Sequence, residues 1–99
     1  MLRAHAARYR ARLAAEDGET RKAEKGFGAA AATFREFGMP FLLAVTLLEQ
    51  GEWLASDGRG AEAQPLLAEA RETFQRLDAT PWLERTQVAE ARPREELTA

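Results

Sequence analysis

Apolar residues recur along two stretches of the chain at steps of four, three, four and three positions. Because an α-helix turns once in about 3.6 residues, this spacing places the side chains on one helical face, whereas a strand would need a period of two. The two stretches lie 40 residues apart, and each follows an Asp-Gly dipeptide. The matched positions are Ala23, Phe27, Ala30, Phe34 and Phe37 in the first stretch, and Ala63, Leu67, Ala70, Phe74 and Leu77 in the second. This repeat predicts two copies of one helical unit.

The segments around this repeat also have helical patterns. Residues 2–13 carry an apolar stripe flanked by arginines, and residues 41–54 are apolar nearly all round, as in a helix buried between neighbours. Gly38 fits a left-handed C-cap, and Thr80-Pro81 combines a capping residue with a proline at the first helical position. The predicted helices span about 2–16, 20–37, 40–56, 60–77 and 81–92, and the tail over 93–99 is expected to be flexible.

A short helix, a tight turn and a longer helix, repeated, indicate an all-α fold. We expect a right-handed stack of antiparallel helix hairpins, an α-solenoid of five helices in which each hairpin buries one face against the next. The chain of 99 residues is long enough for one domain. That domain is predicted over 1–92, with repeats at about 2–39 and 40–80 and a capping helix at 81–92.

One of these units resembles the tetratricopeptide repeat (TPR). Leu47, Gly51 and Leu54 resemble the large-small-large pattern of its first helix, Gly58 its turn glycine, and Ala63, Leu67 and Ala70 the small-large-small pattern of its second helix. Gln50 stands where the family usually has a large apolar residue, and the period of 40 exceeds the usual one. The resemblance implies a divergent, extended repeat whose first helices line a concave face for a partner segment.

A second resemblance covers residues 34–85, about half of the chain. This segment is similar to the carboxy-terminal repeat arm of large bacterial signalling proteins. Those proteins join a class III adenylate or guanylate cyclase domain to an AAA-type or STAND ATPase, and some relatives carry a LuxR-type DNA-binding domain. The resemblance implies regulation through a helical scaffold. The chain contains none of the cyclase or ATPase motifs.

Composition narrows the classes of partner. Fourteen basic and 16 acidic residues give a net charge of −2, which favours neither nucleic acid nor an anionic membrane. The strongest apolar run, residues 41–48, is too short to span a bilayer. The chain has no cysteine, which excludes disulfides and thiolate chemistry. We therefore expect a cytoplasmic protein, and the TPR resemblance implies a protein or peptide partner.

Few residues suit catalysis. Ser56 is the only serine and His5 the only histidine, and they fall at the ends of different predicted helices. Ser56 precedes a turn, where a hydroxyl commonly satisfies backbone groups. Gly26 and Gly28 lie inside a helical stripe without the third glycine of a phosphate loop, and are expected to allow close helix contact. The many carboxylates are interpreted as a solvated surface. We expect no enzyme activity, no metal and no cofactor.

A candidate partner surface comes from the TPR resemblance. The first helices of the repeats would present His5, Arg8, Arg12, Val45, Leu48, Glu52, Thr86 and Ala89. The arginines of the first helix form the wall of a cationic groove for carboxylates in one interpretation. In the other, they only border a buried apolar stripe with their aliphatic stems. Trp53 is expected in the core, whereas Trp82 suits the core and an interface about equally.

Two functions follow as hypotheses. The first is a non-catalytic interaction or scaffolding module of a bacterial signalling or regulatory system. The second is a structural end cap, or a truncated relative, of a larger cyclase- or ATPase-type regulator, with no ligand of its own. Because the outer faces of the terminal helices have no neighbour, Leu2, Tyr9, Trp82 and Leu83 are expected to be partly bare, and a two-fold homodimer would cover them.

Overall fold

The computed structural model describes residues 2–92, and this part of the chain is all-α, with five helices and no strand. The helices are α1 (Leu2–Glu16), α2 (Thr20–Glu36), α3 (Pro40–Ser56), α4 (Gly60–Arg76) and α5 (Thr80–Ala91). The sequence pattern therefore predicted their number and approximate bounds correctly. The expected flexible tail lies outside the described residues. No described helix is both long enough and apolar enough to cross a lipid bilayer.

All four connections end the preceding helix in the same way. Gly18, Gly38, Gly58 and Asp78 have φ values of 75°, 63°, 76° and 57°, in the left-handed region. In each turn the next N–H donates to the carbonyl five residues back, at 2.8–2.9 Å, as in a Schellman C-cap. The predicted cap at Gly38 is confirmed. The turns recur every 20 residues, so each helix and its turn form one structural period.

Two details of the predicted helix ends are wrong. Thr80 does not cap α5, because it is already helical, Ala79 stands at the N-cap, and no side chain caps that end. Phe37 and Leu77 lie just beyond α2 and α4 at the C-cap, with 62% and 41% of their surfaces exposed. The buried stripe of each repeat therefore ends three residues earlier, at Phe34 and Phe74.

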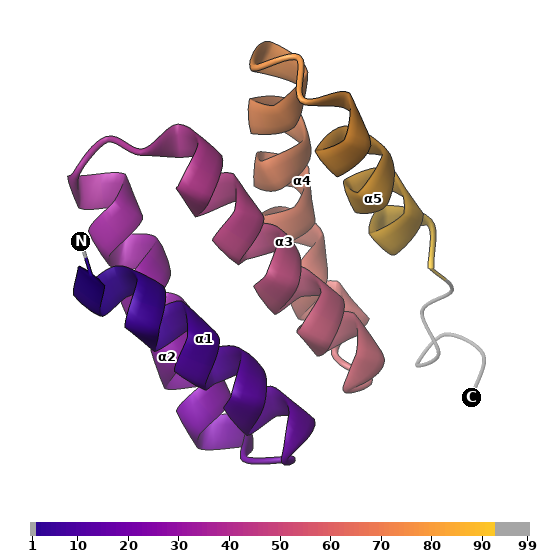
Figure 1. Ribbon diagram of the computed structural model, residues 1–99. Helices are drawn as coiled ribbons and strands as arrows, with labels where there is room; N and C mark the ends of the chain where they lie inside the picture. Colours follow the sequence, from indigo (N-terminus) through magenta and orange to yellow (C-terminus); the bar gives the residue numbers. More distant parts are fainter. Residues whose placement is uncertain (1, 93–99) are drawn as a thin grey trace.

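The helices pack as neighbours in chain order. Figure 1 shows α1 beside α2 at one end of the molecule, α3 beside α4 in the middle, and α5 beside α4 at the other end. The molecule measures 41 × 32 × 18 Å, so it is only about two helices thick. The central helix α3 buries eight residues, from Leu43 to Leu54, which explains its apolar character all round.

The repeated stripe forms the interior. Ala23, Ala30, Ala63 and Ala70 are fully buried, and so are the large residues Phe27, Phe34, Leu67 and Phe74 to within 1%. The large residues fill space within a pair, as Leu67 does beside Gly51, and between pairs, as Phe27 does beside Trp53. Trp53 is partly buried and packs against both core clusters, 5.9 Å from the Phe27 ring. Trp82 is also partly buried, against Phe41 and Phe74.

Glycine allows close contact at two places inside helices. A Cβ atom at Gly26 would lie 2.8 Å from Ala11 Cβ, and one at Gly51 would lie 2.5 Å from Leu67 Cδ2. These glycines let α1 approach α2 and α3 approach α4. Gly28 has no such role, because a Cβ there would meet nothing within 4 Å. The expectation that both glycines of the Gly-Phe-Gly segment serve helix contact is therefore correct for Gly26 and wrong for Gly28.

Candidate functional site

Half of the predicted partner surface lies in the interior. Val45, Leu48, Thr86 and Ala89 are at most 6% exposed, and the Thr86 hydroxyl donates to the Trp82 carbonyl. They lie on the sides of α3 and α5 that pack against neighbouring helices. Their side chains are not accessible to a partner in this structure. His5 is half-buried, with its ring edge-to-face against Phe34.

The predicted arginines of α1 are held by α3. Arg8 Nη1 donates to both carboxylate oxygens of Glu49, at 2.7 and 2.8 Å, and Arg12 lies 3.6 Å from the same carboxylate. The Arg8 and Glu49 side chains are only 13% and 9% exposed. Both guanidinium groups also lie over the Tyr9 ring. Glu49 was not distinguishable in sequence from the other carboxylates, because its partner is 41 residues away.

Glu52 is held in a similar way by α5. Arg85 donates to both of its carboxylate oxygens, at 2.6 and 2.8 Å, and stacks over the Trp82 ring. The hydrogen bond to Glu52, and then its charge and that of Glu49, raise the pKa of Arg85 despite partial burial. Ion pairs thus link α1 to α3 and α3 to α5. The charged residues of the predicted surface, Arg8, Arg12 and Glu52, therefore pair with Glu49 and Arg85, which lie outside that predicted set.

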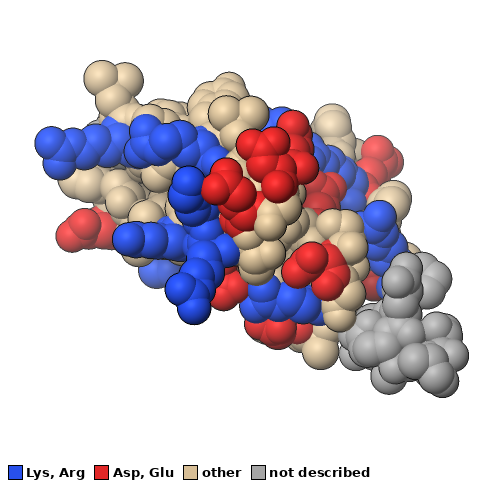
Figure 2. Space-filling model, turned by 90° about the horizontal axis from the view of Figure 1, so that it is seen from below, with Lys and Arg blue, Asp and Glu red and all other residues tan. Residues whose placement is uncertain are grey.

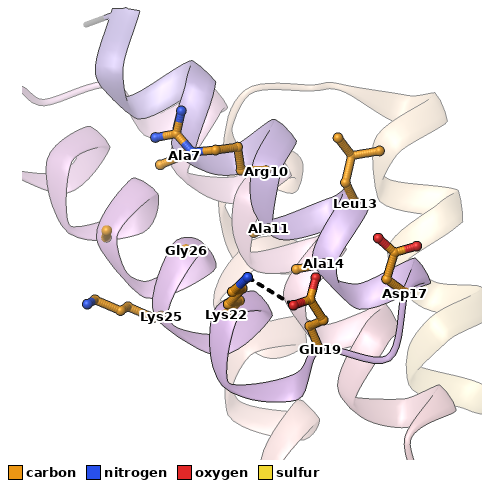
Figure 3. Close-up of a pocket in the computed structure, with 11 residues that line it drawn as sticks. Ala7, Arg10, Ala11, Leu13, Ala14, Asp17, Glu19, Lys22, Lys25 and Gly26 are labelled. Carbon is orange, nitrogen blue, oxygen red and sulfur yellow. Dashed lines mark ion pairs between the residues drawn. The ribbon is translucent and has the colours of Figure 1, made fainter.

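A different surface is hollowed. A groove of about 450 Å³ opens between α1 and α2, on the side away from α3. Its floor consists of small residues that are at least partly buried, Ala7, Ala11, Ala14 and Gly26, and the exposed Ala29 also lines it. Leu13 stands at its edge and is 60% exposed. The rim carries Arg10, Lys22 and Lys25 as well as Asp17 and Glu19 (Figure 3). We call this feature the α1–α2 groove.

The groove exists because small residues line both helices. Ala11 and Ala14 are buried at the contact with α2, and no larger side chain rises from the floor. Lys22 and Glu19 form an ion pair of 3.0 Å at one end (Figure 3). Arg10 lies at the other end of the groove and makes no ion pair within residues 2–92. Sequence reasoning missed the groove, although the alanine content of residues 4–15 is a visible signal.

Charge is distributed unevenly between the two ends of the molecule. Residues 2–39 contain eight basic and five acidic side chains, whereas residues 40–92 contain five and nine. Figure 2 shows Lys and Arg gathered on the α1–α2 side of one face, with Asp and Glu prominent next to them. The groove therefore belongs to the basic end.

The same kind of groove between α3 and α4 is filled. There α2 lies against the pair: Arg59 donates to Glu24 at 2.9 Å, Phe27 packs on Trp53, and Arg35 donates to Glu69 at 2.9 and 3.2 Å. The 40-residue repeat matches Trp53 with Leu13, Arg59 with Glu19 and Glu69 with Ala29. All three counterparts line the α1–α2 groove.

Ser56 and His5, the residues considered for catalysis, do not line the groove. Within residues 2–92 no three His, Cys, Asp or Glu side chains cluster as metal ligands. The Ser56 hydroxyl donates to the Trp53 carbonyl at 2.8 Å, which confirms its local backbone role. Side-chain hydrogen bonds from Arg59 lower the pKa of Glu62, and the hydrogen bonds to Glu62 and Glu24 raise that of Arg59. These shifts belong to ion pairs on the surface of the helices.

Comparison with models of known protein families, with curated proteins and with solved structures gave no match.

Proposed function

We propose that the chain is a non-catalytic protein–protein interaction module of a regulatory or signalling system, and that it binds its partner in the α1–α2 groove. In this proposal the five helices form a TPR-like stack of antiparallel hairpins. The groove offers an apolar floor for a helix or extended segment, and charged side chains at both ends fix its direction.

One observation carries the proposal. Helix α2 packs on the α3–α4 pair, and the described chain has no helix in the corresponding position on the α1–α2 pair. The contacts of α2 there combine an aromatic pair with two sets of ion pairs. Leu13, 60% exposed beside this open groove, lies where burying a large apolar side chain would be favourable. An exposed leucine alone is ordinary, but here it borders a preformed concavity.

Matched substitutions test this function. Leu13→Glu places a charge at the apolar edge of the groove and should abolish capture of the partner from native cell extract. Leu77→Glu makes the same change at an exposed leucine just beyond α4, away from the groove, and should leave capture unchanged. Circular dichroism should show both variants folded. Equal capture by both variants would refute the groove as the binding site.

The second candidate is a structural end cap of a larger protein. The same repeat equivalence favours it, because the groove is where another helix of one continuous array would pack. In that case the groove would be covered permanently. Limited proteolysis of the full native complex would distinguish the two, since a permanent cover protects α1 and α2 in every molecule, whereas a regulated partner protects them only when bound.

No cofactor is part of either proposal. Calorimetry with ATP and with divalent metals should give no specific binding, because the proposed function uses neither. Micromolar affinity for ATP would contradict the non-catalytic function.

A further inference from the structure

We infer that the α1–α2 groove binds α1 of a second copy of this chain, so that two copies form a two-fold pair with Leu13 at the axis. The inference rests on the proposed binding function of the groove and names its partner. It requires an occupant with the correct direction, the correct charge and an apolar residue in the correct register. Helix α1 meets all three requirements.

The direction follows from α2 in the filled groove. Its Glu24 contacts Arg59, just beyond the end of α3, while Phe27 contacts Trp53, six residues earlier in the chain. Helix α2 therefore runs antiparallel to α3. The occupant of the α1–α2 groove should likewise run antiparallel to α1. A two-fold axis perpendicular to a helix relates it to an antiparallel copy of itself, so α1 of a second copy has this direction.

The occupant should carry a positive charge at the position where α2 carries Glu24. Arg59 of the filled groove pairs with Glu62 as well as with Glu24. The open groove has Glu19 in place of Arg59 and Lys22 in place of Glu62, and these two also pair, at 3.0 Å. The side chain that approaches Glu19 should therefore be basic. It should precede by three residues the apolar side chain that packs on Leu13, as Glu24 precedes Phe27.

The described chain has two exposed large apolar residues with a basic residue three positions before them. They are Leu13 after Arg10, and Val88 after Arg85. Arg85 is already bound by both carboxylate oxygens of Glu52. Arg10 is exposed and makes no ion pair within residues 2–92. The Arg10–Leu13 segment of α1 therefore fits the occupant, and α2 itself does not, because it carries Glu24.

One alignment of the two α1 helices allows the same contacts in both copies. When Leu13 of one copy packs on Leu13 of the other, antiparallel α1 helices bring Arg10 level with residue 16 of the opposite copy. Asp17 and Glu19 lie just beyond that level, at the end of the groove away from Arg10 (Figure 3). Each Arg10 then reaches the acidic end of the other groove. The small floor residues let the two backbones approach.

Charge exchange between chains tests this pair. Wild-type protein should show a concentration-dependent dimer by sedimentation equilibrium. Arg10→Glu and Glu19→Arg should each raise the dimer dissociation constant at least roughly tenfold, because each variant places like charges at both ends of the pair. A mixture of the two variants should regain the dimer, because the new glutamate of one chain then meets the new arginine of the other. Arg76→Glu, the same change on α4, should leave the dimer unchanged.

The outcomes separate this inference from the proposed function. A wild-type chain that stays monomeric up to roughly millimolar concentration would overturn the dimer, because even weak encounters associate in that range. A mixture that does not regain the dimer would overturn the Arg10 contact. If Leu13→Glu still abolished capture of a different protein in either case, the groove would remain a binding site with another occupant. Thermal melts establish that each variant is folded.

Discussion

Asp78 shows how one side chain departs from an otherwise regular pattern. It stands at φ 57°, where the three other turns have glycine. An L-residue with a Cβ is strained in this region, although aspartate tolerates it better than most. We expect Asp78→Gly to stabilise the fold by about 0.5–1 kcal/mol in thermal or urea unfolding. Gly58→Asp is the reverse control and should destabilise. A loss of stability in Asp78→Gly would contradict the turn geometry.

Gly26 and Gly28 provide a matched pair two residues apart in α2. Alanine at Gly28 meets no atom within 4 Å and should stabilise the helix by about 0.5–1 kcal/mol through propensity. Alanine at Gly26 meets Ala11 Cβ at 2.8 Å and should destabilise by about 1–3 kcal/mol through overpacking. Urea unfolding of both variants checks the contrast. Equal effects would mean that α1 and α2 do not approach as described.

The sequence could not separate residues that differ only in tertiary surroundings. Gly26 and Gly28 flank Phe27 in α2, and their difference depends on which side of α2 faces α1, which the repeat pattern does not indicate. Leu48 and Thr86 were expected on the partner surface, and both are fully buried because adjacent helices cover them. By contrast, the left-handed glycines and the hydroxyl of Ser56 were predictable, since local backbone geometry determines them.

At the scale of elements, the ion pair between α1 and α3 should contribute measurably to the free energy of unfolding. Arg8 and Glu49 are nearly buried, and Arg8 Nε lacks a hydrogen-bond partner. Glu49→Gln would remove the compensating charge and should destabilise by about 1–3 kcal/mol. Glu69→Gln breaks the more exposed pair with Arg35, and should cost at most about 1 kcal/mol. Urea unfolding that shows a larger loss for Glu69→Gln would contradict this ranking.

The helices themselves were predictable because periodicity and turn residues agree along the chain. All five were expected within about one residue of their observed bounds. Burial was predictable where the repeat indicated it, as for Ala63 and Ala70, which are fully buried. The groove was not predicted, because it results from the absence of large side chains on two helices at once. The groove can be identified only once it is known that α2 fills the corresponding space on α3 and α4.

At the scale of the whole molecule, the charge of the basic end determines how the stability of the proposed dimer depends on salt. Two copies that meet through their α1–α2 ends bring together surfaces with excess positive charge. Salt screens this long-range repulsion more strongly than it weakens a contact pair at hydrogen-bond distance. The dimer should therefore be stronger at about 150 mM salt than at roughly 10 mM, where the screening length is about 30 Å. An acidic heterologous partner in the same groove would show the opposite dependence.

The central claim is that another helix covers the α1–α2 groove, and thiol labelling tests it most directly. The chain has no cysteine, so Ala29→Cys places a single thiol in the groove lining, and Ala61→Cys serves as an exposed alanine control on α4. We expect Ala29→Cys to be labelled rapidly in dilute protein and slowly once excess wild-type chain or the native partner is added. Ala61→Cys should be labelled at one rate throughout. A labelling rate at position 29 that does not change with either addition would contradict coverage of the groove by another helix.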